Sequence, residues 1–234
     1  MINTLAAVFA LAACGQTSAP QPGAAPRSAQ RPVAQALHVN ASAEDCYVAA
    51  AETFEGLTEK APSAPVAELA RETASAAVQA RSCQPSLGDA RSAPLDNVLG
   101  RLGQFETTHD RSALAMAAVE GYRTFVTAQS RPTGSIPLEV ALLDYAGFRF
   151  QAGAHATPPS WADMRQALDV ADRQWRAASP RVSDNRLKTR FSEDLADMRA
   201  ALSASNQVRA QRAARRELDH VDLLENYFSR PAHG

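Results

Sequence analysis

The sequence predicts an all-α protein, an antiparallel helical bundle of about six to seven helices around one central apolar helix. Apolar residues recur at spacings of three and four along most of the 234-residue chain, and prolines and capping residues separate the periodic segments. No alternating apolar and polar run bounded by turn residues indicates β-strands. The short connections between consecutive helices favour antiparallel neighbours.

The first element, residues 1–13, is a short apolar run that ends in small residues. It is shorter than the roughly 20 residues that a membrane-spanning helix needs, so we expect a signal peptide. Its end resembles the lipobox of bacterial lipoproteins, carried here by Leu11, Ala12, Ala13 and Cys14. The resemblance implies that the leader is cleaved before Cys14 and that Cys14 is acylated and held in the lipid bilayer. Residues 2–4 lack the Lys or Arg that such leaders usually carry.

The second element, residues 14–40, is rich in Pro, Ala, Gly, Ser and Gln. Such a segment buries too little apolar surface to offset its ordering entropy, so we expect a disordered tether. It would hold the domain that follows, residues 41–230, on the order of 25 to 30 Å from the membrane. Gly15, rather than Asp, follows Cys14, which favours the outer over the inner membrane by analogy with enteric lipoproteins. The predicted location is therefore the cell envelope, facing the periplasm.

The third element, residues 41–84, is expected to be a helical hairpin broken near Pro62 and stapled by a disulfide. In an oxidising envelope, the even pair Cys46 and Cys83 favours a disulfide over a metal or redox site. In an antiparallel hairpin these two residues come to the same open end.

The main bundle is expected over residues 95–230, after a connector at 85–94. Prolines, serines and capping residues divide it. The expected helices run over about 95–105, 107–129, 136–152, 160–178, 183–202 and 207–228.

The segment 136–152, IPLEVALLDYAGFRFQA, is the predicted central helix, because it is apolar around most of its circumference. Leu142 and Tyr145 belong to one broad apolar face, and Leu143 and Phe150 belong to a second. A helix that is apolar on two sides must be covered on two sides.

Two polar residues of this helix carry specific expectations. Arg149 falls within the broad apolar face, where an unpaired guanidinium would be too costly, so we expect a buried ion pair with Glu120 or Glu217. Asp144 falls in the narrow polar sector. Any ligand cavity should therefore lie along residues 136–152.

Four residues are candidates for metal or haem ligation: His109, Met116, Glu217 and His220. Glu217 and His220 have the Glu-x-x-His spacing of di-iron bundles, but no second such element is present. His109 and Glu120 would lie about 16 Å apart along one helix, too far to share an ion. The helical pattern distantly resembles periplasmic b-type cytochrome bundles, which ligate haem through Met and His. That resemblance points to Met116 and His220.

The charge pattern and the absence of catalytic motifs bound the function. The formal net charge of −1 and a pI near 6.5 do not favour nucleic acid as a partner. The last helix carries a basic patch, Arg209, Arg212, Arg215 and Arg216, interpreted as a solvated helix face. No Gly-rich phosphate loop or catalytic group arrangement is recognisable, and no cofactor is expected. The sequence therefore predicts a non-enzymatic envelope lipoprotein with an envelope protein as partner or a supporting role. The alternative is a bundle that binds a small ligand, metal or haem.

Overall fold

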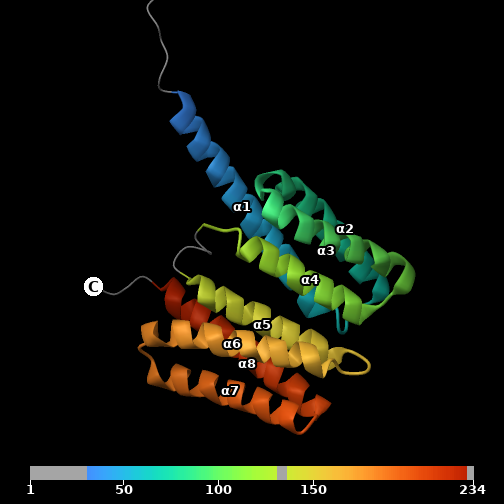
Figure 1. The fold of residues 1–234 in the computed structure, drawn as a ribbon, viewed down its shortest axis with the longest axis vertical. Helices are drawn as coiled ribbons and strands as arrows, with labels where there is room; N and C mark the ends of the chain where they lie inside the picture. The colour runs from blue at the N-terminus through green and yellow to red at the C-terminus, as the bar shows by residue number, and fades with distance from the viewer. Residues whose placement is uncertain (1–30, 131–135, 231–234) are drawn as a thin grey trace, which may run out of the picture.

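A computed structural model describes the backbone of residues 31–130 and 136–230, and side chains from residue 43 onward. These residues form eight α-helices and two short 3-10 helices, and no strand occurs among them (Figure 1). The elements are α1 (Arg31–Lys60), α2 (Val66–Cys83), η1 (Gln84–Ser86), α3 (Asp89–Thr108), α4 (Arg111–Val126), α5 (Leu138–His155), α6 (Trp161–Ala178), η2 (Ser179–Arg181), α7 (Asn185–Ser203) and α8 (Gln207–Ser229). The predicted all-α fold is confirmed. The predicted signal peptide and Cys14 lie outside the described residues.

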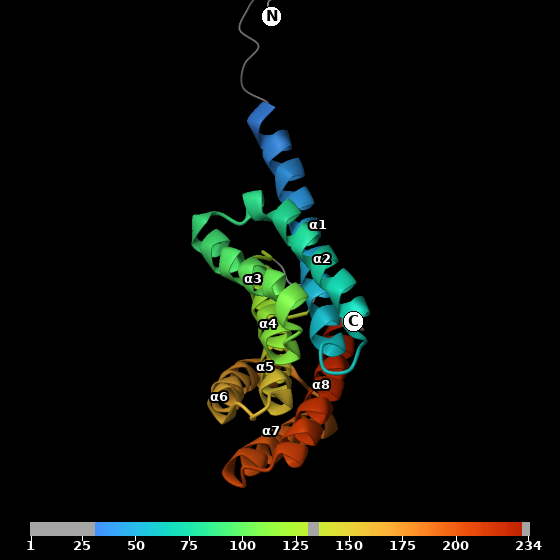
Figure 2. The same ribbon diagram turned by 90° about the vertical axis from the view of Figure 1, so that its right-hand side faces the viewer.

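The helices form two groups stacked along the long axis of the molecule, α1–α4 above and α5–α8 below (Figures 1 and 2). In the first group α4 packs against α1 and α3, and in the second α5 packs against α6 and α8. Each group has its own apolar core. Phe54 and Phe125 stack in the first core with ring centroids 5.8 Å apart, and Trp175 and Phe191 meet in the second at 4.6 Å.

Helix α5 belongs to both cores, as predicted for the central helix. Tyr145 and Phe148 are buried in the first core, with α1–α4. Leu143 and Phe150 are buried in the second, with α6–α8. The two apolar faces in the sequence thus correspond to two separate packing interfaces, which join the two groups of helices into one domain.

Two glycines allow neighbouring helices to approach closely. A Cβ at Gly121 of α4 would overlap the ring of Phe54 from α1. A Cβ at Gly147 of α5 would overlap Glu217 and Leu218 from α8. The absence of a side chain at these positions is therefore a packing requirement.

The predicted disulfide is present between Cys46 of α1 and Cys83 at the end of α2, with their Cα atoms 5.7 Å apart. It closes the open end of the α1–α2 hairpin, as the sequence predicts. In the entropy model, closing a loop of this length contributes roughly 3 to 4 kcal/mol to stability.

The break predicted near residue 106 lies at His109 and Asp110 instead, and two helix starts differ more widely from those predicted. Helix α1 begins at Arg31, inside the predicted tether, with Pro32 in its first turn, where a missing N–H removes no helical hydrogen bond. Helix α3 begins at Asp89 and contains Pro94, which was expected to lie in a connector. Pro94 lies in the second turn on the exposed side, while Leu95 directly after it is fully buried. Burial of the following apolar stripe thus outweighs the local cost of the proline.

The close approach at Gly121 predicts opposite outcomes for two Gly→Ala changes. Gly121→Ala should lower the free energy of unfolding by about 1 to 3 kcal/mol, because the added methyl group forces the Phe54 ring to move. Gly100→Ala, the control, lies in α3 with nothing within 4 Å of the new Cβ. It should raise stability by about 0.5 to 1 kcal/mol through helix propensity. Urea unfolding followed by circular dichroism measures both, and equal stability of the two variants would contradict the packing argument.

Candidate functional site

A cavity of about 200 Å³ lies between α1, α5 and α8. Its walls are formed by Glu55, Glu59, Asp144, Phe148, Gln151, Arg215, Leu218, Asp219 and Asp222. A second cavity, of about 150 Å³, shares Glu55 with the first and is lined by Val48, Ala51, Glu52, Tyr122, Val126, Gln129, Ile136, Ala141 and Glu225 as well. Both cavities border the central helix, where the sequence predicts that a ligand cavity should be sought. Together we call them the acidic cavity.

Of the carboxyl groups that line the acidic cavity, the three that are not exposed come from three helices: Glu55 from α1, Asp144 from α5 and Glu225 from α8. Asp144 is only 3% exposed, because its narrow polar sector lies where the two cores meet. The hydroxyl of Tyr122 donates a hydrogen bond to Asp144 Oδ2 at 3.4 Å.

Burial and mutual repulsion raise the pKa of all three carboxyl groups. Burial raises the pKa of Glu55 to about 7, and the nearby Glu225 adds to this shift. Burial also raises the pKa of Asp144 well above its ordinary value, followed by repulsion from Glu225 and Glu55. The pKa of Glu225 is raised by burial and by Asp222, although its hydrogen bond to Asp144 opposes the shift.

No ion pair compensates the carboxyl groups of the acidic cavity, and Arg215 is the one positively charged residue among the described residues that line it. None of Glu55, Asp144 and Glu225 forms an ion pair with another residue of the described chain. The aromatic ring of Phe148 and the side chain of Leu218 supply an apolar wall beside these carboxyl groups. Carboxylates beside hydrocarbon are the complement of a cation that carries an organic body.

A basic groove of about 440 Å³ adjoins the acidic cavity and shares Gln151 and Arg215 with it. The remaining lining residues are His155 from α5 and Val208, Gln211, Arg212 and Arg216 from α8. Gln211 fastens this part of α8 to the end of α5 by donating to the carbonyl oxygen of Ala154 at 3.1 Å. Partial burial lowers the pKa of His155, and the positive charge of Arg215 lowers it further.

The four arginines of the predicted basic patch divide into two pairs. Arg209 and Arg216 form ion pairs with Asp197 of α7. Arg212 and Arg215 form no ion pair with any described residue, and both line the groove. The interpretation as a wholly solvated face is therefore too simple, because Arg209 and Arg216 hold α7 against α8, while Arg212, Arg215 and Arg216 border the groove.

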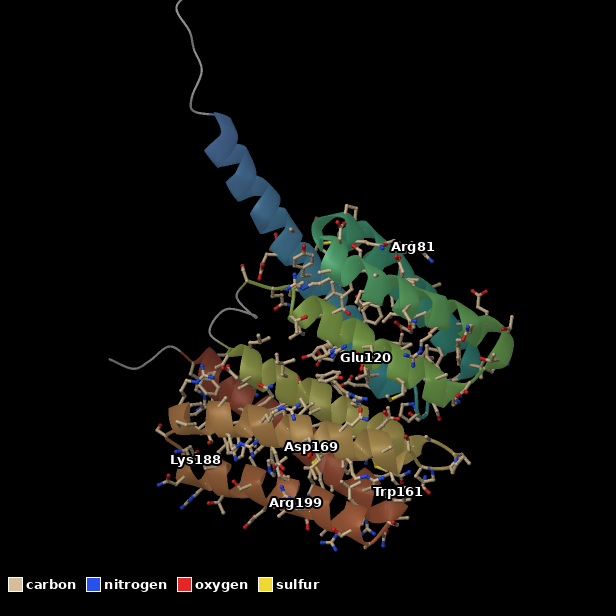
Figure 3. The ribbon with its side chains drawn as sticks, in the orientation of Figure 1. Arg81, Glu120, Trp161, Asp169, Lys188 and Arg199 are labelled. Atoms are coloured by element: carbon tan, nitrogen blue, oxygen red, sulfur yellow. A yellow bond between two sulfur atoms is a disulfide. The ribbon has the colours of Figure 1, made fainter. Side chains whose placement is uncertain are left out.

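The predicted partner of Arg149 is wrong. Its guanidinium pairs with Asp163 in the first turn of α6 at 3.1 Å, not with Glu120 or Glu217. Glu120 lies where α4 faces α5 (Figure 3), but it is ion-paired with Arg123 at 2.8 Å and reaches Arg149 only through the hydroxyl of Tyr145. Asp163 lies close enough to pair with Arg149 because α6 folds back directly onto α5.

The metal and haem candidates do not come together. His109 is exposed at the left-handed end of α3, and Met116 packs against the first core. His220 forms a hydrogen bond with Asp194 of α7, beside the second core. No group of three His, Cys, Asp or Glu side chains suited to a metal ion occurs in the described ranges. The Met116 and His220 counterparts suggested by the cytochrome resemblance thus belong to different halves of the domain.

Glu217 is a buried acid rather than a ligand. It is fully buried, and both of its carboxyl oxygens lack a hydrogen-bond partner. Burial raises its pKa well above the ordinary value, with repulsion from Asp194 adding to the shift. Burial therefore favours its uncharged form, in keeping with its sequence position inside the apolar arc of α8.

The sequence contained an overlooked signal for the acidic cavity. In α1, Glu52, Glu55 and Glu59 recur at spacings of three and four, so they share one helix face. In α8, Asp222 and Glu225 repeat the same spacing. Like charges at such spacings destabilise an isolated helix. Two such rows within one domain indicate a shared acidic surface. The spacing does not indicate that the two rows face each other.

No protein-family profile, no curated protein and no solved structure matches this chain. Among the described helices, none has the length and apolar character required to cross a membrane.

The raised pKa values predict that the domain loses stability as the pH rises. The pKa of Glu55 goes from 4.5 to about 7 on folding, so between these values the folded state holds more protons than the unfolded state and stability falls with increasing pH. Asp144 and Glu225 shift in the same direction. Glu55→Gln should reduce the loss between pH 5 and pH 8 by about 1 to 2 kcal/mol, allowing for solvent screening.

Urea unfolding of the disulfide-bonded protein at both pH values measures this loss. Glu106→Gln is the matched control, since Glu106 is exposed on α3 and does not line the acidic cavity. A Glu55→Gln variant with the same pH dependence as Glu106→Gln would show that Glu55 is not buried as described.

Proposed function

We propose that this protein is a bacterial lipoprotein held in the cell envelope by acylated Cys14, with a helical domain that binds a ligand without chemical conversion. The lipobox-like sequence at residues 11–14 supports the anchor. The disulfide between Cys46 and Cys83 supports an oxidising compartment, because such bonds rarely persist in the cytosol. The predicted preference for the outer membrane and the predicted envelope protein partner both stay predictions.

We infer that the ligand is an organic cation. The observation that carries this inference is the convergence of Glu55, Asp144 and Glu225 on one cavity with no ion pair among them and with Phe148 in its wall. Asp144 is buried and Glu55 and Glu225 are half-buried, and carboxyl groups in such places without an ion pair destabilise the free protein at neutral pH. A bound ammonium group would supply a positive charge, while Phe148 would contact its hydrocarbon part.

Hexylamine tests this inference, because at pH 8 it carries one ammonium group on an apolar chain. We expect calorimetric titration to show binding at pH 8 and about tenfold weaker binding at pH 5, where the carboxyl groups are protonated. The Glu55→Gln, Asp144→Asn double variant should lose binding at pH 8, and Glu106→Gln should keep it. Hexanol, the uncharged control, should not bind. Equal binding of hexylamine and hexanol, or unchanged binding by the double variant, would reject a cation site.

The anchor is tested separately by expressing the full chain in an enteric bacterium with radiolabelled palmitate. The wild-type protein should incorporate label and sediment with membranes, because acyl chains on Cys14 anchor it. Cys14→Ala should incorporate no label and appear in the soluble periplasmic fraction. Gly15→Asp should keep the label and move toward the inner membrane. A labelled or membrane-bound Cys14→Ala variant would contradict the assignment of Cys14.

A further inference from the structure

The acidic cavity and the basic groove form two ends of one continuous surface on α5 and α8. They share two wall residues, Gln151 and Arg215, so the two hollows are directly adjacent. The charge along α8 changes sign at this point. Asp219 and Asp222 line the acidic side, whereas Arg212 and Arg215 line the basic side.

The separation of the two charged ends follows from helix geometry. Asp219 and Arg212 are seven residues apart on α8, as are Asp222 and Arg215. At a rise of 1.5 Å per residue, each pair is separated by about 10 Å along the helix axis. A molecule that contacts both ends must therefore carry its opposite charges about this far apart.

The basic end offers free donors and some apolar surface. Arg212 and Arg215 lack ion pairs in the described chain, so their guanidinium groups can bind a carboxylate in the bidentate manner. Val208 in the same groove is 58% exposed, an unusual exposure for a valine. The groove thus combines two free positive charges with an apolar contact.

The neighbouring acids restrict what can bind here. A polyanion or an anionic membrane surface that covered the groove would also approach the acidic cavity and be repelled by it. The start of α8 also lies at the end of the molecule away from the first turn of α1, to which the predicted membrane tether is joined (Figures 1 and 2). A small molecule that carries both charges is therefore favoured over a polyanion and over an anionic membrane surface.

We propose that the ligand is a zwitterion of the class of short unblocked peptides, with its ammonium group in the acidic cavity and its carboxylate at Arg212 and Arg215. This inference rests on the proposed cation site and adds the anionic end of the ligand. An extended chain reaches about 3.3 to 3.6 Å per residue, so three residues span the distance between the two ends. Gln151 lies in both walls, where its amide meets the middle of the peptide.

Calorimetric titration of the full chain at pH 7 with three peptides tests the proposal, because the α-amino group of a peptide is mostly protonated at that pH. The probes are trialanine, trialanine amide, which keeps only the ammonium group, and N-acetyl-trialanine, which keeps only the carboxylate. We expect trialanine to bind about tenfold more tightly than either blocked peptide, because each blocked form loses one charged contact.

Two variants separate this proposal from the cation site. The Arg212→Gln variant should lose most of the preference for trialanine over its amide, and it should bind hexylamine as the wild type does, because Arg212 does not line the acidic cavity. Arg190→Gln, the control on exposed α7 surface, should change neither affinity. Equal affinity of wild-type protein for trialanine and its amide would overturn the zwitterion proposal and leave the cation site standing. Failure of both hexylamine and trialanine to bind would overturn the proposed function itself.

Discussion

Burial of α5 on two opposite faces is the constraint on which the rest of this structure depends. Helices α1–α4 cover the face that contains Tyr145 and Phe148, and α6–α8 cover the face that contains Leu143 and Phe150. Neither group of helices could bury its own core without α5, so the two groups form one domain. A helix covered in this way keeps only a narrow polar sector, and Asp144 occupies it. The acidic cavity arises at this position because α1 and α8 approach α5 there from opposite groups.

Two acidic side chains of this domain, Glu217 and Asp144, are buried in different surroundings. Glu217 contacts the backbone of α5 at Gly147 and has no polar partner, so burial favours its uncharged form. Asp144 faces a cavity and accepts a hydrogen bond from the hydroxyl of Tyr122. A titratable group that is both buried and accessible to a small molecule is typical of a functional site. That difference is why the ligand is placed at Asp144 and not at Glu217.

Helix α8 combines three roles along its 23 residues. Ala210, Ala214 and Val221 pack in the second core, while Arg209 and Arg216 hold α7 through Asp197. The charged residues that border the acidic cavity or the basic groove are Arg212, Arg215, Arg216, Asp219, Asp222 and Glu225. The small alanines let α8 lie close to its neighbours, and this proximity brings charges of both signs beside α5.

The sequence by itself determined the helical class, the two-sided character of α5 and the pairing of Cys46 with Cys83. These features depend on local periodicity, on breaks at prolines and on the even number of cysteines after Cys14. All three can be read directly from the sequence. Only the tertiary structure decided that Arg149 pairs with Asp163 and that Glu55 faces Asp144. Periodicity shows which face of a helix is apolar, but the rotation and axial position of one helix against another depend on packing. Contacts between polar groups on different helices follow from that packing.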